Sequence, residues 1–126
     1  MLDKLKSFIA EYHLAEPNDR LLLAVSGGKD SVFTSHILKY KYNMKPLTVT
    51  WAPNIYTDWG RKNFDSWINS GFDNYLMTPS GKSKRLLTRL AVENLFHPFQ
   101  PFILGQKNLA PKIAAQYDIP LIFYGE

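Results

Sequence analysis

The stretch that decides the fold is LLLAVSGGKDSVF, residues 21–33, in which apolar residues lead directly into a loop of serines, glycines and a lysine. A continuous apolar run such as Leu21–Val25 is typical of a strand that is buried on both faces, as strands of parallel sheets are. Helical spacing of apolar residues resumes at Phe33, Ile37 and Tyr40. The stretch therefore predicts a strand, a tight glycine turn and a helix.

The same alternation of short apolar runs and helical spacing continues to the end of the chain. We expect further strands at Leu47–Trp51, Asn74–Thr78, Pro101–Leu104 and Pro120–Tyr124. Apolar residues at helical spacing predict helices between the strands, and an amphipathic helix over residues 2–14. This pattern indicates an α/β fold, a three-layer sandwich in which helices cover both faces of a mostly parallel, five-stranded sheet.

Length and composition indicate one globular domain over residues 1–126, with residues 1–18 as an N-terminal helix and linker. No apolar run approaches the roughly 20 residues that a membrane-spanning helix needs, and the N-terminus has no signal-peptide core. We therefore expect a cytoplasmic protein. The net charge of +4 suits a small anionic ligand as well as nucleic acid. Glu126 follows the last expected strand with no covering helix, so we expect a fragment of a longer protein.

The chain contains no cysteine. Disulfides, cysteine-ligated zinc, thiol nucleophiles and persulfide carriers are therefore excluded within it. Its three histidines, at positions 13, 36 and 97, show no metal-ligand spacing.

The loop Ser26–Ser31 combines several features of a phosphate site. Its two glycines let the backbone turn tightly and approach an anion closely. Backbone N–H groups at a helix start are unpaired and carry partial positive charge. Lys29 adds a full charge, and the serine hydroxyls can donate hydrogen bonds. Together these features predict that the loop binds phosphate.

Spacing excludes two familiar phosphate loops. The pattern G-x-x-x-x-G-K-[ST] fails because Leu23 stands at its first glycine and Asp30 follows Lys29. The dinucleotide pattern G-x-G-x-x-G fails because no third glycine follows. A second Gly-Lys-Ser, at residues 81–83, has Leu76 at the place of its leading glycine, so we interpret it as the basic start of a helix.

The segment AVSGGKDS, residues 24–31, resembles the S-G-G-x-D-S loop of the PP-loop ATP pyrophosphatases, which include tRNA lysidine synthetase, tRNA thiolation enzymes and the GMP, NAD and asparagine synthetases. The resemblance implies a Rossmann-like, adenine nucleotide alpha hydrolase-like fold. It also implies that ATP is cleaved between its α and β phosphates. AMP would pass to a substrate oxygen, and a nucleophile would then displace it.

ATP and Mg²⁺ are the cofactors that this resemblance implies. The loop residues expected to bind ATP are Ser26, Gly27, Gly28, Lys29, Asp30 and Ser31. Of these, Lys29, Asp30 and Ser31 are the expected catalytic residues. Asp30 is the candidate magnesium ligand, because the pyrophosphate needs a counter-ion; capping of the following helix is the alternative. Thr50 and Trp51 follow the second strand, where the superfamily places the adenosine, although Trp51 could instead belong to the core.

Residues 38–64, 70–95 and 100–126, which include PFILGQ and IPLIFYGE, resemble the N-acetyl sugar amidotransferases of bacterial surface-polysaccharide and nonulosonic-acid pathways. The resemblance implies conversion of the acetamido group of a nucleotide-linked N-acetyl sugar into an acetamidino group, in lipopolysaccharide (O-antigen) biosynthesis. An amide carbonyl is a poor electrophile, and adenylation of its oxygen makes AMP a leaving group that ammonia can displace. The resemblance implies that a separate glutaminase partner complex supplies the ammonia, and the chain itself has no cysteine to act as a glutaminase nucleophile.

Ligands of parallel sheets bind at the carboxyl ends of the strands, so residues that follow strands are the remaining candidates. Gly105 and Gln106 follow the expected fourth strand and match the family's GQ; we expect them to bind nucleotide. Basic residues that open a helix oppose its dipole, as Lys82, Lys84 and Arg85 do, and this favours an anionic ligand. The expected substrate residues are Arg61, Lys82, Arg85 and Glu126, with solvated surface charge as the alternative for the basic ones.

Two other functions stay open. The first is tRNA modification by the same loop, of the lysidine or thiolation type. Thiolation usually needs cysteine-based sulfur chemistry, which is absent, and the downstream segments fit the lysidine branch less well. The second is a truncated ATP-binding module without activity. Membrane and nucleic acid are not the expected partners, and a homo-oligomer is left open.

Overall fold

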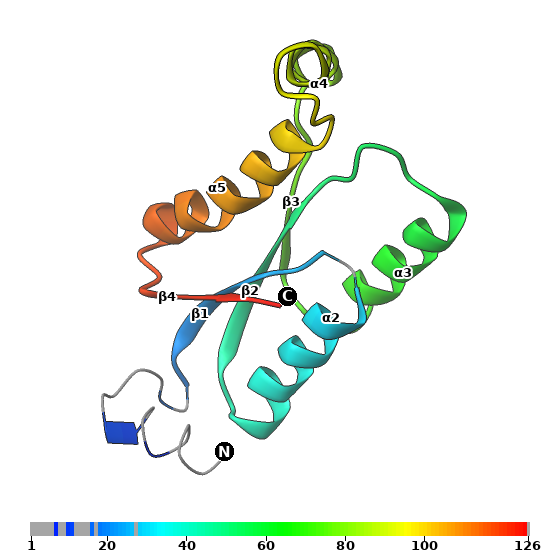
Figure 1. Ribbon diagram of the computed structural model, residues 1–126. Coiled ribbons are helices and arrows are strands. Elements are labelled where there is room, and N and C mark those ends of the chain that lie inside the picture. Colours follow the sequence, from blue (N-terminus) through cyan, green and yellow to red (C-terminus); the bar gives the residue numbers. More distant parts are fainter. Residues whose placement is uncertain (1–6, 8–9, 12–15, 17, 27, 126) are drawn as a thin grey trace.

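The computed structural model describes residues 7, 10, 11, 16, 18–26 and 28–125 (Figure 1). Most of the helix expected over residues 2–14, together with Gly27 and Glu126, lies outside the described residues. In chain order the elements are β1 (Arg20–Ala24), α2 (Lys29–His36), the π-helix η1 (Ile37–Lys41), β2 (Lys45–Trp51), α3 (Asp58–Ile68), β3 (Asn74–Met77), α4 (Gly81–Leu95), α5 (Gln100–Tyr117) and β4 (Leu121–Tyr124).

The four strands form one sheet in the order β3-β2-β1-β4, and every neighbouring pair is parallel. β1 lies inside the sheet, where Leu22 is in register with Leu47 on one side and with Ile122 on the other. The predicted α/β fold with a parallel sheet is confirmed. The prediction of five strands is wrong, because the described residues form four.

The expected strand at Pro101–Leu104 is instead the first turn and a half of α5. An apolar run of four residues does not distinguish a strand from a buried helix segment. Proline suits the first turn of a helix, where its missing N–H is not needed, and Pro101 occupies that place. Gly105 and Gln106 therefore lie within a helix and do not follow a strand.

The core lies on both faces of β1, whose Leu21, Leu22 and Leu23 have no solvent exposure. Leu21 and Leu23 pack with Trp67 and other residues on the side of α2 and α3, whereas Leu22 packs with Ile113 of α5 on the other side. Figure 1 shows α2 and α3 on one side of the sheet and α5 on the other. The alternation of side chains along one buried strand thus produces the three-layer arrangement.

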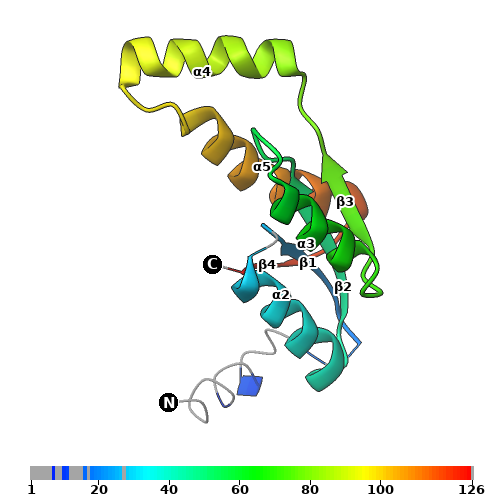
Figure 2. The same cartoon turned by 90° about the vertical axis from the view of Figure 1, so that its right-hand side faces the viewer.

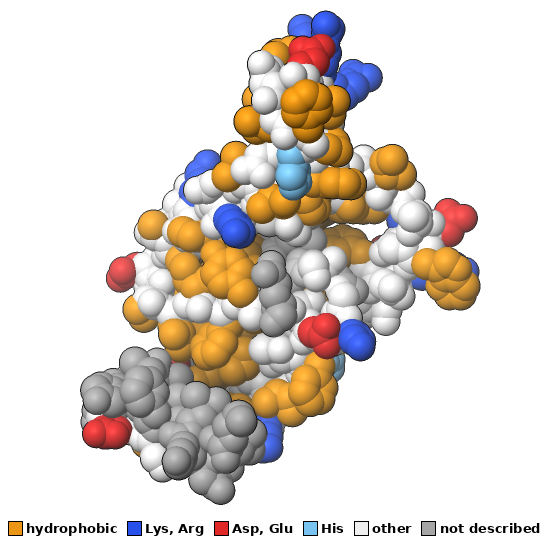
Figure 3. All heavy atoms as spheres, in the orientation of Figure 1, with side chains coloured by type: hydrophobic (Ala, Val, Ile, Leu, Met, Phe, Trp, Pro, Cys, Tyr) orange, Lys and Arg blue, Asp and Glu red, His pale blue; other side chains and the backbone are white. Residues whose placement is uncertain are grey.

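Helix α4 stands away from the sheet (Figure 2). Ala91 is its one buried residue, and several of its large apolar side chains are exposed: Leu86, Leu87, Leu90, Val92 and Leu95. The space-filling view shows hydrophobic side chains on and below this helix, with basic side chains at its outer surface (Figure 3). α4 is therefore an arm that packs mainly against α5.

None of the helices in the described part of the chain is both long enough and apolar enough to cross a membrane.

Candidate functional site

The site forms where the chain changes direction across the sheet. β2 lies on one side of β1 and β4 on the other, although β2 and β3 precede β4 in the sequence. Such a switch point leaves an open crevice at the carboxyl ends of the two central strands, because the connecting helices leave on opposite faces. The loop after β1 lies at this crevice, as the sequence pattern predicts.

The β1 loop continues the sheet and then turns directly into α2. The N–H of Val25 donates to the carbonyl of Val49 at 2.8 Å, which extends the β1–β2 pairing by one residue. The Ser26 hydroxyl accepts a hydrogen bond from the Gly28 N–H at 3.3 Å. Gly28 is the N-cap of α2 and is extended, with φ −78° and ψ 163°.

The start of α2 has no side-chain cap, in contrast to α3 and α4. Thr57 caps α3 by accepting from the Gly60 N–H at 3.0 Å, and Ser80 caps α4 by accepting from the Ser83 N–H at 3.5 Å. The first N–H groups of an α-helix have no partner within the helix and carry partial positive charge. At α2 these groups remain available to an anion.

The three expected catalytic residues occupy different environments. Lys29 and Asp30 are exposed at the first turn of α2. Ser31 is buried, and its hydroxyl donates to the Gly28 carbonyl at 3.0 Å. Asp30 does not cap α2, because the N-cap is Gly28. The Ser31 side chain thus stabilises the start of α2 through a buried contact, whereas the charged side chains of Lys29 and Asp30 are exposed to solvent.

Gly125, which follows β4, lies directly against the first turn of α2. A Cβ atom at Gly125 would stand 2.5 Å from Cα and 2.6 Å from Cβ of Ser31. Only glycine allows the chain leaving β4 to pass so close to the backbone of α2. The closeness of β4 to the loop depends on this contact, and no local sequence pattern indicates it.

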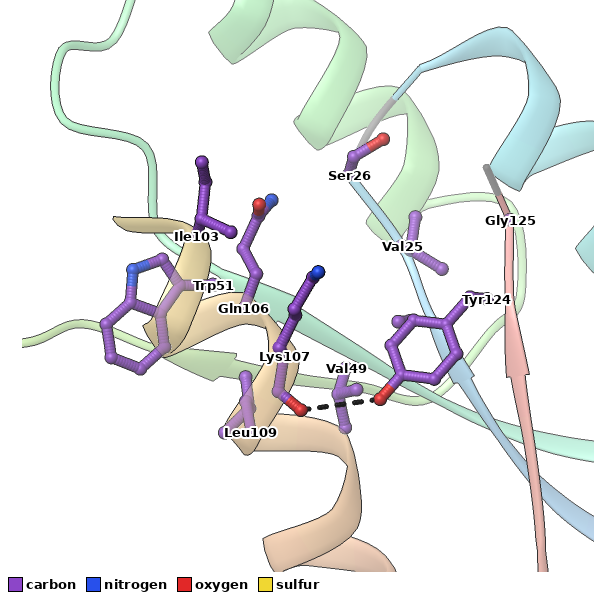
Figure 4. A pocket seen from close by; sticks show the side chains of 11 residues that line it. Val25, Ser26, Val49, Trp51, Ile103, Gln106, Lys107, Leu109, Tyr124 and Gly125 are labelled. Atoms are coloured by element: carbon purple, nitrogen blue, oxygen red, sulfur yellow. Dashed lines mark hydrogen bonds between the residues drawn. The ribbon is translucent and has the colours of Figure 1, made fainter. Parts of the chain in front are cut away.

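Two adjoining cavities, of about 280 Å³ and 220 Å³, lie beside the loop. Both are lined by Ser26, Trp51 and Gln106. The larger lies between α5 and the ends of β1, β2 and β4, and Figure 4 shows Gln106 and Lys107 of α5 reaching toward it. The smaller lies on the side of the β2–α3 connection. Together the two volumes suit a ligand of nucleotide size.

Trp51 forms the wall between these spaces, and it does so because Gly105 lacks a side chain. A Cβ atom at Gly105 would overlap the indole ring of Trp51. The indole Nε1 is buried and has no hydrogen-bond partner among the described residues. The glycine that was expected to end a strand therefore serves instead to seat the Trp51 ring against α5.

A proline within α5 leaves a carbonyl free for β4. Pro111 has no N–H, so the carbonyl of Lys107 lacks its usual helical partner. The Tyr124 hydroxyl donates to that carbonyl at 3.4 Å (Figure 4). Lys107 and Tyr124 both line the larger cavity, so this contact links its two walls. Sequence reasoning did not indicate Tyr124.

Thr50 and the β2–α3 connection have structural contacts of their own. Thr50 is buried and donates its hydroxyl hydrogen to Oδ1 of Asn74 at 3.0 Å, while it also lines the smaller cavity.

The basic residues expected to bind substrate are exposed. The guanidinium of Arg61 lies 5.0 Å from the ring centre of Tyr56. Lys82 and Arg85 are also exposed, on α4.

Lys84 is the basic residue of α4 that turns inward. Its Nζ donates to the carbonyl of Ala52, just after β2, at 3.4 Å. Burial disfavours the charged form and lowers the pKa of Lys84 below its usual 10.5. Sequence reasoning placed Lys84 in the basic helix start but selected its two neighbours as substrate residues, because spacing alone does not say which lysine faces the sheet.

No group of three or more histidine or carboxylate side chains that could hold a metal ion occurs in the described part of the chain. Asp30 is a single carboxylate at the loop. One carboxylate together with phosphate oxygens is a common arrangement for Mg²⁺, so the residues present fit a magnesium ion that arrives with a nucleotide.

Among characterised proteins, the chain is similar to the tRNA(Ile)-lysidine synthase of Symbiobacterium thermophilum, with 37% identity over 46 residues. The match covers 36% of this chain and 9% of that enzyme, so the chain corresponds to a small part of its relative. No protein-family model matches the chain. The relative is a PP-loop ATP pyrophosphatase, and the match supports that superfamily but not the sugar amidotransferase branch.

Proposed function

We propose that the cleft binds ATP and that the protein is an adenylating enzyme of the ATP pyrophosphatase type. The observation that carries this proposal is the uncapped start of α2 beside two cavities that share Ser26, Trp51 and Gln106. The N-terminus of α2 and Lys29 would hold the phosphates. The adjoining apolar space, walled by Val49 and Leu109, would take the nucleoside.

In the proposed reaction a carbonyl oxygen of the acceptor attacks the α-phosphorus of ATP. The bond from that phosphorus to the β-phosphate bridging oxygen breaks, and pyrophosphate leaves. A nitrogen nucleophile then adds to the activated carbonyl carbon, loses a proton, and expels AMP. The chain's contribution is to orient the phosphates and to stabilise the charge that develops on them.

Mg²⁺ would supply positive charge to the departing pyrophosphate, with Asp30 holding it directly or through water. Ser31 would act through its backbone N–H, because its hydroxyl is already bonded to the Gly28 carbonyl. Gly27 and Glu126 stay in the proposal as loop and substrate residues on the strength of the resemblance alone.

The proposed acceptor is a nucleotide-linked N-acetyl sugar, whose acetamido group would become an acetamidino group in surface-polysaccharide biosynthesis. Its support is the resemblance of residues 21–126 to the N-acetyl sugar amidotransferases. Ammonia would come from a glutaminase partner, since the sequence has no cysteine to serve as a glutaminase nucleophile. We place the reaction in the cytoplasm, where ATP is available.

Transfer RNA is the second candidate acceptor, and the partial match to a tRNA(Ile)-lysidine synthase favours it. The same adenylation and displacement steps apply. A carbonyl group of an RNA base takes the place of the sugar's amide, and an amine takes the place of ammonia.

Exchange of labelled pyrophosphate into ATP tests the proposal, because the adenylation step is reversible. The protein is assayed with UDP-N-acetylglucosamine and related N-acetyl sugar nucleotides, or with transfer RNA. Exchange that depends on an N-acetyl sugar nucleotide is the expected result. Exchange with tRNA only would move the assignment to the second candidate, and ATP binding without exchange under any condition would indicate a binding module.

A further inference from the structure

A third cavity, of about 410 Å³, lies between the end of β3, the N-terminal half of α4 and residues 101–112 of α5. Its walls are largely apolar and include Met77, Leu87 and Phe102. Trp51 lines it as well as the two cavities beside the loop. A volume of this size is typical of a small-molecule site.

The cavity carries positive charge without a counter-charge. Lys84 and Lys112 line it, and no acidic residue does. Lys84 Nζ lies 5.8 Å from the ring centre of Phe102 and donates to a backbone carbonyl, while neither lysine forms an ion pair with a described carboxylate. An ammonium that is partly removed from water and lacks an anionic partner favours binding of an anion.

The cavity adjoins the site at the loop. It shares Trp51 and Phe102 with the 220 Å³ cavity, which Ser26 also lines. The Trp51 ring lies between the two cavities, and its Nε1 is buried without a hydrogen-bond partner among the described residues. An extended ligand could therefore reach from Lys84 to the phosphate loop.

We propose that the α4–α5 cavity binds the diphosphate of a nucleotide-linked sugar, with Lys84 as its main anion contact, and so positions the sugar toward the loop. This inference rests on the proposed function, because it names the subsite for the same acceptor. A diphosphate flanked by rings matches a compact apolar cavity that is lined by two lysines and no acidic residue. A nucleic-acid strand, with its regular phosphates, would call for a longer basic track than these two lysines.

Nuclear magnetic resonance titration of the ¹⁵N-labelled chain provides the test. α,β-methylene-ATP is added first, which tests nucleotide binding without cleavage. UDP-N-acetylglucosamine is added next, and the Trp51 indole N–H and the amides of α4 near Lys84 are followed. We expect these signals to shift with UDP-N-acetylglucosamine, and N-acetylglucosamine without phosphates to bind far more weakly.

Three variants make the test specific. Loss of one charged hydrogen bond is expected to weaken UDP-N-acetylglucosamine binding by about tenfold or more in Lys84→Gln, and Lys84→Arg should restore most of it. Arg89→Gln removes a charge from the same helix outside the cavity, where Arg89 pairs with Glu93, and should bind normally. Equal binding by Lys84→Gln and the unaltered chain would overturn the proposal, as would an equal loss in Arg89→Gln.

The two proposals fail separately. If α,β-methylene-ATP binds but UDP-N-acetylglucosamine does not shift the Trp51 indole, the α4–α5 subsite is wrong and the nucleotide site stands. If α,β-methylene-ATP does not bind, the proposed function fails, whatever the sugar nucleotide does. Binding of an RNA stem-loop in its place, with the same dependence on Lys84, would also overturn the sugar-nucleotide assignment.

Discussion

The β1–α2 junction and helix α4 border neighbouring cavities but are held in place in different ways. β1 is fully buried at Leu21, Leu22 and Leu23, and the loop that follows is fixed from behind by Gly125 against Ser31. On α4, by contrast, Ala91 is the one buried residue. The proposed phosphate loop thus adjoins the buried centre of the fold, whereas the proposed acceptor side belongs to a lightly packed arm.

This difference suggests a division of roles. A loop that orients phosphates needs fixed geometry, because small displacements reduce catalysis strongly. An acceptor site can tolerate an arm that adjusts to its ligand, since elements with few buried contacts are the ones that move at low cost. The comparison makes testable predictions for stability and for binding.

The largest expected effect on stability comes from a substitution in β1, at the centre of the sheet. Leu22→Ala should lower the free energy of unfolding by about 2–5 kcal/mol, because it leaves a cavity in a fully buried site. Leu90→Ala, on the exposed face of α4, should change it by less than about 0.5 kcal/mol. Urea denaturation measures both. Similar losses in the two variants would show that α4 is as firmly packed as β1.

Two glycines give the next comparison. Gly125→Ala should destabilise the protein by about 1–3 kcal/mol, because its Cβ would meet the backbone of Ser31. Gly81→Ala, at the start of α4, has no atom within 4 Å of the new Cβ and should be neutral or stabilising by up to about 1 kcal/mol. Thermal unfolding followed by circular dichroism compares the pair. A neutral Gly125→Ala would mean that β4 does not fix the loop.

At the loop, Lys29→Ala should weaken ATP binding by about tenfold, because it removes a charged contact to phosphate. The free energy of unfolding should stay within about 0.5 kcal/mol, since Lys29 is exposed. Isothermal titration calorimetry measures the affinity. Matched control substitutions of exposed Lys41 or Lys62 to Ala should leave ATP binding unchanged; an equal loss there would indicate a general charge effect.

The smallest expected effect is a pH dependence of the contribution that Lys84, on α4, makes to the free energy of unfolding. The pKa of Lys84 is lowered by burial, so between this pKa and 10.5 the unfolded chain binds more protons than the folded one. The contribution of Lys84 to stability should therefore rise with pH in that window. We would measure the free energy of unfolding of the unaltered chain and of Lys84→Met from neutral pH to 10.5. The difference between the two chains isolates the contribution of Lys84. A difference that is constant with pH would contradict the desolvation of Lys84.

Sequence reasoning succeeded where local pattern and burial agree. The run Leu21–Val25 and the glycines after it leave few alternatives, and the fold around them is as expected. It failed at Pro101–Leu104, because a short apolar run fits a helix and a strand equally well and the following Gly105 looked like a strand end. The role of Gly105 is to leave room for the Trp51 ring. That role depends on packing between residues distant in the sequence, which sequence spacing does not reveal.

The same limit applies to the site. The sequence indicated the loop, Trp51 and Gln106, and the structure brings Ser26, Trp51 and Gln106 to shared cavities. It did not indicate Tyr124, whose partner carbonyl is free because of a proline in another element. It also did not separate Lys84 from Lys82 and Arg85, because which side of a helix faces the protein is decided by tertiary packing.

The identity of the nucleotide products tests the central claim most directly. The protein is incubated with ATP, Mg²⁺ and ammonium chloride, with UDP-N-acetylglucosamine or with transfer RNA and lysine as the acceptor system, and the products are separated by chromatography. The account predicts AMP and pyrophosphate in equal amounts with one of the acceptors. Formation of ADP and inorganic phosphate would contradict it, because the loop would then be directing cleavage at the γ-phosphate.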